Sequence, residues 1–157
     1  MVELKEAETK EGYNLATTLF KEYVSQLGID LSFQNFNNEL ENLAIEYGKP
    51  DGTIFIAYYD DEPVGCFGVR KLEDSICELK RMYVRDTVRG LGVGKQLLKK
   101  SIEVGKQLGY SKMRLDTLAT MHKAINLYKQ AGFYEIEPYR FNPIEGAKYF
   151  EIDLDEN

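Results

Sequence analysis

The chain has 157 residues, which is enough for a single domain with a substantial core, and its 43% hydrophobic and 29% charged residues are typical of a soluble globular protein. The formal net charge of −6 argues against nucleic acid as a partner. No apolar run approaches the roughly 20 residues of a membrane helix, and the segment 1–13 is charged and largely polar. We therefore expect no membrane partner, no secretion signal and a cytoplasmic location.

The hydrophobic periodicity predicts, in chain order, an edge strand at 2–7, a helix at 12–27, a helix over 33–47 with Ser32 as N-cap, strands at 53–59, 64–72 and 76–84, a helix at 92–108, a strand at 112–117, a helix at 120–131, and a final hairpin pair at 133–139 and 147–154. This order predicts an α/β (α+β) fold. We expect one domain over residues 1–157, with a mixed, mostly antiparallel sheet of about six or seven strands and about four helices.

The two cysteines and the predicted edge strands indicate which metals and partners to expect. Cys66 and Cys77 lie in apolar, strand-like stretches and are expected to be free, buried thiols. The spacing of Cys and His residues does not suggest a metal site, so we expect none. Exposed edge strands are compatible with a homodimer.

The strand at 76–84 contains a change of parity in its apolar residues. Leu79 and Met82 cannot lie on one face if side chains alternate strictly. A β-bulge at Lys80-Arg81, in the fourth predicted strand, would return both halves to the same buried face. The alternative is a strand without a bulge that is buried on both faces.

Three glycines at alternate positions occupy the stretch Arg89-Gly90-Leu91-Gly92-Val93-Gly94-Lys95, between the predicted strand 76–84 and helix 92–108. Because glycine has no Cβ, a ligand can approach the backbone N–H groups closely. The first N–H groups of the helix and the positive end of its dipole form an anion site. Arg89 and Lys95 add positive charge. The stretch predicts a pyrophosphate cradle; the alternative is a plain turn that caps the helix.

Two common phosphate loops do not fit this stretch. A P-loop requires Ser or Thr after its Gly-Lys pair, but Gln96 follows Lys95, and Arg89 stands where the first glycine would be. A Rossmann loop requires Gly-x-Gly-x-x-Gly after the first strand, and the last glycine spacing here is shorter and lies late in the chain.

The stretch Arg89-x-x-Gly92-x-Gly94 resembles the acetyl-CoA loop of the GCN5-related N-acetyltransferases, the GNAT superfamily. The strand before it, Glu-Leu-Lys-Arg-Met-Tyr-Val at 78–84, is similar to that family's fourth strand. Farther on, the run 124–133 resembles the family signature A-x-x-x-Y-x-x-x-G-F. The chain is therefore similar to this superfamily over nearly its whole length, most strongly from Glu78 to Phe133.

The resemblance implies a set of cofactor-binding residues. They are Met82, Tyr83 and Val84, whose backbone would pair with the pantetheine arm; Arg89, Gly90, Leu91, Gly92, Val93, Gly94 and Lys95, which would bind the pyrophosphate; Asn126, which would contact the pantetheine arm; and Tyr128, which would lie near the thioester sulfur.

The resemblance also implies catalytic roles. Tyr128 would act as the general acid, its alternative being a core aromatic. Glu78 occupies the position of a catalytic glutamate in some relatives, and its alternative is a structural or substrate-orienting carboxylate. His122, the single histidine, has a suitable intrinsic pKa for a proton shuttle but a weaker claim. Val84 N–H would stabilise the carbonyl oxygen of the thioester. Arg140 would either bind an acceptor carboxylate or be a solvated loop arginine.

The function expected from these residues is transfer of the acetyl group of acetyl-CoA to a primary amine of a small molecule, amino-acid derivative or peptide, by direct attack in a ternary complex. Two alternatives stay open: a non-catalytic acyl-CoA-binding module on the same fold, and transfer of a different acyl group. The loop cannot indicate which acyl group is transferred, because it would bind the phosphates that all acyl-CoA donors share.

Overall fold

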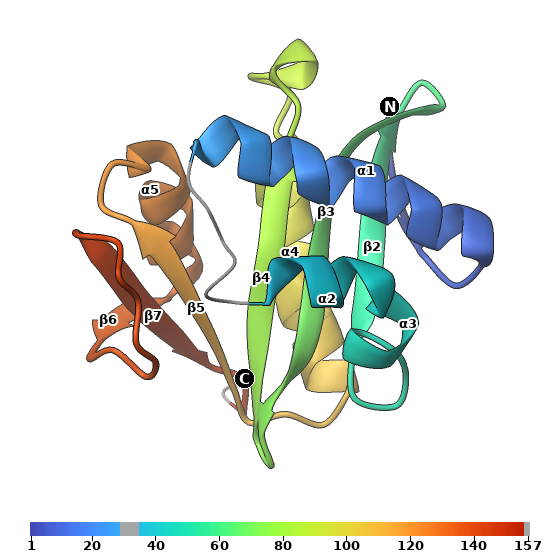
Figure 1. Cartoon of the computed structure of the whole chain (residues 1–157). Helices are drawn as coiled ribbons and strands as arrows, with labels where there is room; N and C mark the ends of the chain where they lie inside the picture. The colour runs from blue at the N-terminus through green and yellow to red at the C-terminus, as the bar shows by residue number, and fades with distance from the viewer. Residues whose placement is uncertain (29–34, 156–157) are drawn as a thin grey trace.

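A seven-stranded sheet in the order β1-β2-β3-β4-β5-β7-β6 forms the centre of the molecule (Figure 1). The structure, a computed structural model, describes residues 1–28 and 35–155. The strands are β1 Val2–Glu6, β2 Thr53–Tyr59, β3 Glu62–Glu73, β4 Ile76–Val84, β5 Lys112–Leu118, β6 Tyr134–Ile136 and β7 Ala147–Asp153. Every neighbouring pair is antiparallel except β4 and β5, which confirms the predicted mixed, mostly antiparallel sheet.

Helices cover both faces of the sheet (Figure 1). They are α1 Lys10–Leu27, α2 Phe36–Glu41, α3 Leu43–Glu46, α4 Val93–Gln107 and α5 His122–Ala131. The first three pack on one face around a core that includes Phe20, Tyr47 and Ile56, and the last two pack on the other around Phe67, Leu97 and Phe150. None of the helices among the described residues is long and apolar enough to cross a membrane.

The single helix predicted over 33–47 is wrong in its described part, because two short helices replace it. Asn42 separates α2 from α3 with a non-helical φ of −131°. Its side-chain amide donates to the Asn38 carbonyl at 2.9 Å, and such local bonds compete with continued helix. The expected N-cap Ser32 and the neighbouring Phe33 lie outside the described residues.

Local signals set the ends of the longer helices. The Thr9 side chain caps α1 by accepting from the Gly12 N–H at 3.1 Å, and Gly28 ends that helix with a φ of 67°. Gly132 ends α5 in the same left-handed conformation, with a φ of 109°. Cys66 and Cys77 are free and buried, as expected.

The predicted bulge in β4 is confirmed. Cys66 pairs with Tyr83 and Gly68 with Lys80, so two steps along β3 match three along β4, and Arg81 has a φ of 57°. Leu79 and Met82 consequently pack into the same core, on the α4 side. The strand is nevertheless buried on both faces, because Lys80 and Arg81 are 3% and 6% exposed on the opposite side.

The parallel pairing of β4 and β5 is short, and this positions the site. It runs from Ile76 opposite Lys112 to Glu78 opposite Arg114 and then ends. Beyond that point β5 continues to pair with β7 along its whole length, whereas β4 leans away (Figure 1). The two strands therefore form a V whose apex is at Glu78.

A buried ion pair fastens α2 to the bulge. Arg81 donates to Glu39 from Nε at 3.0 Å and from Nη2 at 2.8 Å, and the Tyr47 hydroxyl donates to the same carboxylate at 2.9 Å. Burial would raise the pKa of Glu39, but the hydrogen bond and charge of Arg81 outweigh it and lower that pKa. The carboxylate is therefore charged and satisfied although Glu39 is only 2% exposed.

Replacing Glu39 by alanine should lower the free energy of unfolding by about 3–5 kcal/mol, because the Arg81 charge would remain buried without this carboxylate. Urea denaturation measures the change. Glu41→Ala, on the exposed face of the same helix, is the matched control and should change stability by less than about 0.5 kcal/mol. Equal effects of the two substitutions would contradict the anchoring role of Glu39.

Candidate functional site

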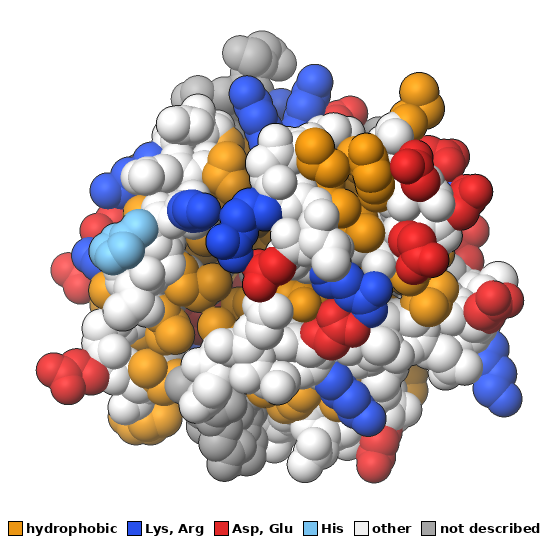
Figure 2. All heavy atoms as spheres, turned by 90° about the horizontal axis from the view of Figure 1, so that it is seen from above, with side chains coloured by type: hydrophobic (Ala, Val, Ile, Leu, Met, Phe, Trp, Pro, Cys, Tyr) orange, Lys and Arg blue, Asp and Glu red, His pale blue; other side chains and the backbone are white. Residues whose placement is uncertain are grey.

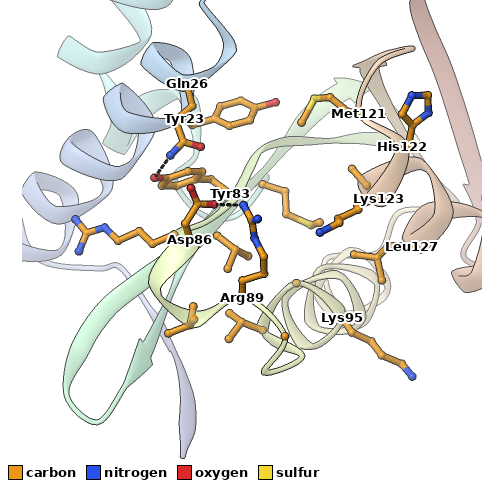
Figure 3. Close-up of a pocket in the computed structure, with 18 of the residues that line it drawn as sticks. Tyr23, Gln26, Tyr83, Asp86, Arg89, Lys95, Met121, His122, Lys123 and Leu127 are labelled. Atoms are coloured by element: carbon orange, nitrogen blue, oxygen red, sulfur yellow. Dashed lines mark hydrogen bonds and ion pairs between the residues drawn. The ribbon is translucent and has the colours of Figure 1, made fainter.

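A cavity of about 900 Å³ opens where β4 and β5 separate, between α1 and α5 (Figure 3). Its inner surface is mainly apolar, formed by Leu27, Met82, Val84, Leu118, Met121 and Leu127. Its cationic lining residues are Arg85, Arg89, Lys95 and Lys123, and Asp86 and His122 also belong to the lining. Figure 2 shows the hollow with its apolar floor and with Lys and Arg side chains gathered beside it. The cavity suits a ligand with an anionic end and a long, less polar arm.

The glycine loop forms one end of this cavity. Gly90 and Gly92 adopt left-handed φ angles of 86° and 77°, which only glycine adopts easily, and a Cβ on either would meet nothing within 4 Å. Gly92 begins α4 without a side-chain cap, and the first turn of the helix is closed by a hydrogen bond from the Gln96 N–H to the Gly92 carbonyl at 3.2 Å. The N–H groups from Gly92 to Lys95 precede that bond, and because these residues line the cavity, their N–H groups are suited to bind an anion there.

Two predicted loop residues have other contacts. The Leu91 N–H donates to the Val88 carbonyl at 3.2 Å, and the Leu91 side chain is 47% exposed, so this N–H is already used within the turn. The Arg89 guanidinium pairs with Asp86 at 2.6 Å (Figure 3). Because both partners are about two-thirds exposed, with 66% and 68% of their side chains accessible, the pair is weak and Arg89 can exchange Asp86 for a phosphate.

The β4 segment 82–84 lies along the cavity with its backbone unpaired on the β5 side, since the described ladder between these strands ends at Glu78. Met82 and Val84 direct their side chains to the apolar floor. The Tyr83 side chain instead points to α1, where its hydroxyl donates to Glu22 at 3.1 Å and accepts from Gln26 at 3.3 Å. The three predicted residues of this segment therefore line the same cavity as the glycine loop.

Helix α1 is fastened over the cavity by Arg85. Its guanidinium donates to Glu22 at 2.8 and 2.5 Å and to the Pro63 carbonyl at 2.8 Å. The hydrogen bond from Arg85 is the main cause of a lowered pKa for Glu22. Burial, followed by the hydrogen bond to Glu22, raises the pKa of Tyr83 to about 12. The carboxylate is charged and the phenol neutral at neutral pH, which keeps this connection intact.

Tyr128 and Asn126 are not among the side chains that line the cavity. Tyr128 is 7% exposed and packs against the rings of Phe133 and Phe150, and burial raises its pKa well above the ordinary value. Asn126 is exposed and lies on another side of α5 than Ala124 and Leu127, which line the cavity. Successive residues of an α-helix are rotated by about 100° about its axis, so Asn126 cannot share their direction. Their cofactor contacts, and the acid role of Tyr128, stay predictions.

Glu78 lies at the apex of the V, away from the cavity lining. It is fully buried and accepts hydrogen bonds from Arg70 at 3.3 Å, from Tyr139 at 2.8 Å and from Arg140. Burial raises its pKa, but Lys80, Arg140, Arg70 and the Tyr139 hydrogen bond together lower it below the ordinary value. A general base at neutral pH needs a raised pKa, so this environment favours the structural alternative for Glu78.

Arg140 is not a solvated loop arginine, which corrects one of the two readings of that residue. Its side chain is 20% exposed, binds Glu78 and lies 3.5 Å from Asp116. The connection between β6 and β7 folds back across the V, and the Tyr139 ring lies 5.1 Å from the Arg140 guanidinium. The sequence offered no sign of this, because Arg140 and Glu78 are 62 positions apart.

Several cavity residues were missed by sequence reasoning. Tyr23 is one of the residues with four-residue spacing in the predicted helix 12–27, and it lines the cavity together with Gln26. Arg85 and Lys123 flank the motifs without belonging to them. That spacing predicts a helix but does not show that a cavity lies beside Tyr23. Within the described residues, no cluster of three His, Cys, Asp or Glu side chains is placed to hold a metal.

A family model for the Acetyltransferase (GNAT) family matches residues 12–133, so the chain belongs to this family. It is 41% identical over 138 residues to an uncharacterised N-acetyltransferase of Schizosaccharomyces pombe, covering 87% of this chain and 85% of that one. A GNAT-family acetyltransferase structure from Staphylococcus aureus Mu50 has a TM-score of 0.81 and 23% identity, over 99% of this chain and 100% of that one.

A third match has a bound ligand. The structure of a proposed streptothricin acetyltransferase from Bacillus anthracis, solved in complex with acetyl coenzyme A, has a TM-score of 0.60 and 24% identity over 68% of this chain and 65% of that one. The family match and the shared fold confirm the resemblance found in the sequence and mark the chain as an acetyltransferase family member.

Gly92→Asp should lower the affinity for CoA by at least about tenfold, because it places a negative charge at the open N-terminus of α4. Gly109→Asp is the matched control. Gly109 has a similar left-handed φ of 93° and equal room for a Cβ, but lies at the opposite end of α4. Calorimetric titration with CoA measures both variants. The same affinity in both would contradict the anion site at the loop.

The Glu78 carboxylate should stabilise the fold at neutral pH and lose this effect at acidic pH, where it becomes protonated. Its folded-state pKa is lowered, so its contribution is present above the unfolded value of about 4.3 and is lost as the pH falls through the folded value. Glu78→Gln should therefore be less stable than wild type by about 3 kcal/mol near neutral pH, with a smaller difference at about pH 3. Urea denaturation at both pH values tests this, and a difference that grows in acid would contradict it.

Proposed function

We propose that this chain transfers the acetyl group of acetyl-CoA to a primary amine of a small molecule, amino-acid derivative or peptide, by direct attack in a ternary complex. The observation that carries the proposal is the junction of an N–H-lined glycine loop with the apolar cavity and the unpaired β4 backbone. The acetyl-CoA complex of the similar Bacillus anthracis structure supports the choice of donor.

Binding of the donor would divide between the two parts of the cavity. The N–H groups from Gly92 to Lys95, helped by the Arg89 and Lys95 charges, would hold the pyrophosphate. The backbone of β4 from Met82 to Val84 would bond to the amide groups of the pantetheine arm as a neighbouring strand would. The apolar side chains around Leu127 would cover the methylene groups of that arm.

The chemistry needs a neutral amine and a polarised carbonyl. A lysine-like amine, with a reference pKa of about 10.4, must lose a proton before attack, and water in the cavity can carry it away. The Val84 N–H would donate to the carbonyl oxygen as charge develops on it. Tyr128 is the proposed hydrogen-bond donor to the departing sulfur, and because it lies outside the cavity lining, this role requires its ring to turn toward the cavity. We assign Glu78 to positioning, since its bonds to Tyr139 and Arg140 hold the β6–β7 connection across the V.

The test is thiol release from acetyl-CoA with a panel of free amino acids, polyamines and lysine-containing peptides. At least one amine should accelerate release, and Tyr128→Phe should lower turnover by about tenfold or more while changing CoA affinity less. Tyr110→Phe, at a buried tyrosine near the far end of α4, is the control and should do neither.

Three other outcomes are informative. Equal losses of turnover and affinity in Tyr128→Phe would make Tyr128 a packing residue. Binding of acetyl-CoA without thiol release by any amine of the panel would favour the non-catalytic module. Faster release from a longer acyl-CoA than from acetyl-CoA would replace the donor in the proposal.

A further inference from the structure

Tyr23 presents a hydroxyl group to the cavity from the middle of α1. Its side chain is half-buried, lines the cavity, and points across it toward Met121 (Figure 3). The ring lies 6.0 Å from the ring of Tyr83. Its hydroxyl makes no hydrogen bond with another residue of the described part of the chain. A hydroxyl group without a partner among the described residues is thus available in the section of the cavity that faces Met121.

Tyr23 lies at one end of the cavity, far from the glycine loop. Tyr23 and Met121 lie at the end opposite Lys95 (Figure 3). A ligand held by its phosphates at the glycine loop would extend its other end toward Tyr23. Tyr128, which belongs to the core behind α5, is not part of this lining.

The segment that carries Tyr23 is fixed on both sides. The preceding residue, Glu22, is bound by Arg85 and Tyr83, and Gln26, one turn later, donates to the same Tyr83 hydroxyl at 3.3 Å. These contacts hold the Tyr23 backbone in place before any ligand enters. A donor fixed in advance contributes more to catalysis than one that must reorganise.

We infer that Tyr23 is a second hydrogen-bond donor to the acyl carbonyl oxygen of the bound thioester, facing the β4 backbone across the cavity. The inference rests on the proposed function, because it needs acetyl-CoA in this cavity. It identifies α1, in addition to the glycine loop and β4, as part of the reacting end of the site.

The phenol would keep its proton throughout the reaction. Burial raises the pKa of Tyr23 to about 12, well above the ordinary thiol value of about 8.5. Tyr23 is therefore a poor acid toward a thiolate but a good neutral donor. As the amine nitrogen forms its bond to the acyl carbon, the carbonyl electron pair moves to oxygen, where Tyr23 bonds it. When the pair returns, the carbon–sulfur bond breaks and the electrons leave on sulfur, while the nitrogen loses a proton through water to become an amide and that proton balances the charge of the thiolate.

The experiment compares the affinities of acetyl-CoA and CoA in calorimetric titrations of wild type, Tyr23→Phe and Tyr13→Phe. Only acetyl-CoA carries the carbonyl oxygen, so Tyr23→Phe should weaken acetyl-CoA by about three- to tenfold and leave CoA within about twofold. Tyr13, ten positions earlier on the same helix and outside the cavity lining, is the matched control and should change neither affinity.

Turnover supplies the second readout. With the most active amine of the panel, Tyr23→Phe should lower kcat by about ten- to hundredfold, because the bond strengthens as charge develops on oxygen. Phenylalanine retains the ring, and an unchanged thermal midpoint would show that packing is intact.

The outcomes separate the two proposals. If wild type binds acetyl-CoA and turns over, but Tyr23→Phe keeps the wild-type affinities and kcat, the Tyr23 assignment is wrong and the proposed function stands. Equal weakening of acetyl-CoA and CoA would also overturn it, since Tyr23 would then be a general wall residue. Wild type that binds neither compound would overturn the proposed function and this assignment with it.

Discussion

The early end of the β4–β5 ladder is the constraint on which the rest of the structure depends. Parallel pairing stops after Glu78 and Arg114 because β5 continues along β7 while β4 bulges at Arg81. A continuous sheet would have used the β4 backbone groups in a ladder and closed the cavity. The break leaves these groups open beside an apolar floor. The site is therefore a consequence of interrupted strand pairing, with the glycine loop at its outer end.

Buried charges hold this interruption in a single geometry. The Glu39–Arg81 pair fastens α2 to the bulge, and the Glu78 carboxylate joins β3, β4 and the β6–β7 connection at the apex. Buried ion pairs are weak evidence for stability, since hydrophobic replacements can stabilise as much. Their bonds are directional, however, and fix elements from different parts of the chain relative to one another. In this molecule we assign them to the shape of the V.

In the proposed function, the cavity would separate recognition of the donor from recognition of the acceptor. Donor phosphates would meet backbone N–H groups and a cationic rim, contacts that depend little on the acyl group or the amine. The end of the cavity away from the loop, where the reaction would take place, is surrounded by α1, the segment before α5 and, at the apex, the β6–β7 connection. Acceptor choice would thus depend on elements that vary independently of the loop.

The sequence by itself determined the features that arise from neighbouring residues. Alternating side chains predicted the strands Thr53–Tyr59 and Ile76–Val84, and a change of parity predicted the β4 bulge. The glycine loop is recognisable because glycine adopts positive φ easily. Each of these signals extends over only a few positions. Only the tertiary structure decided that Tyr23 enters the cavity, that Tyr128 lies behind it, and that Arg140 is held by Glu78. These depend on contacts between distant segments, whose geometry leaves no periodic trace in the local sequence.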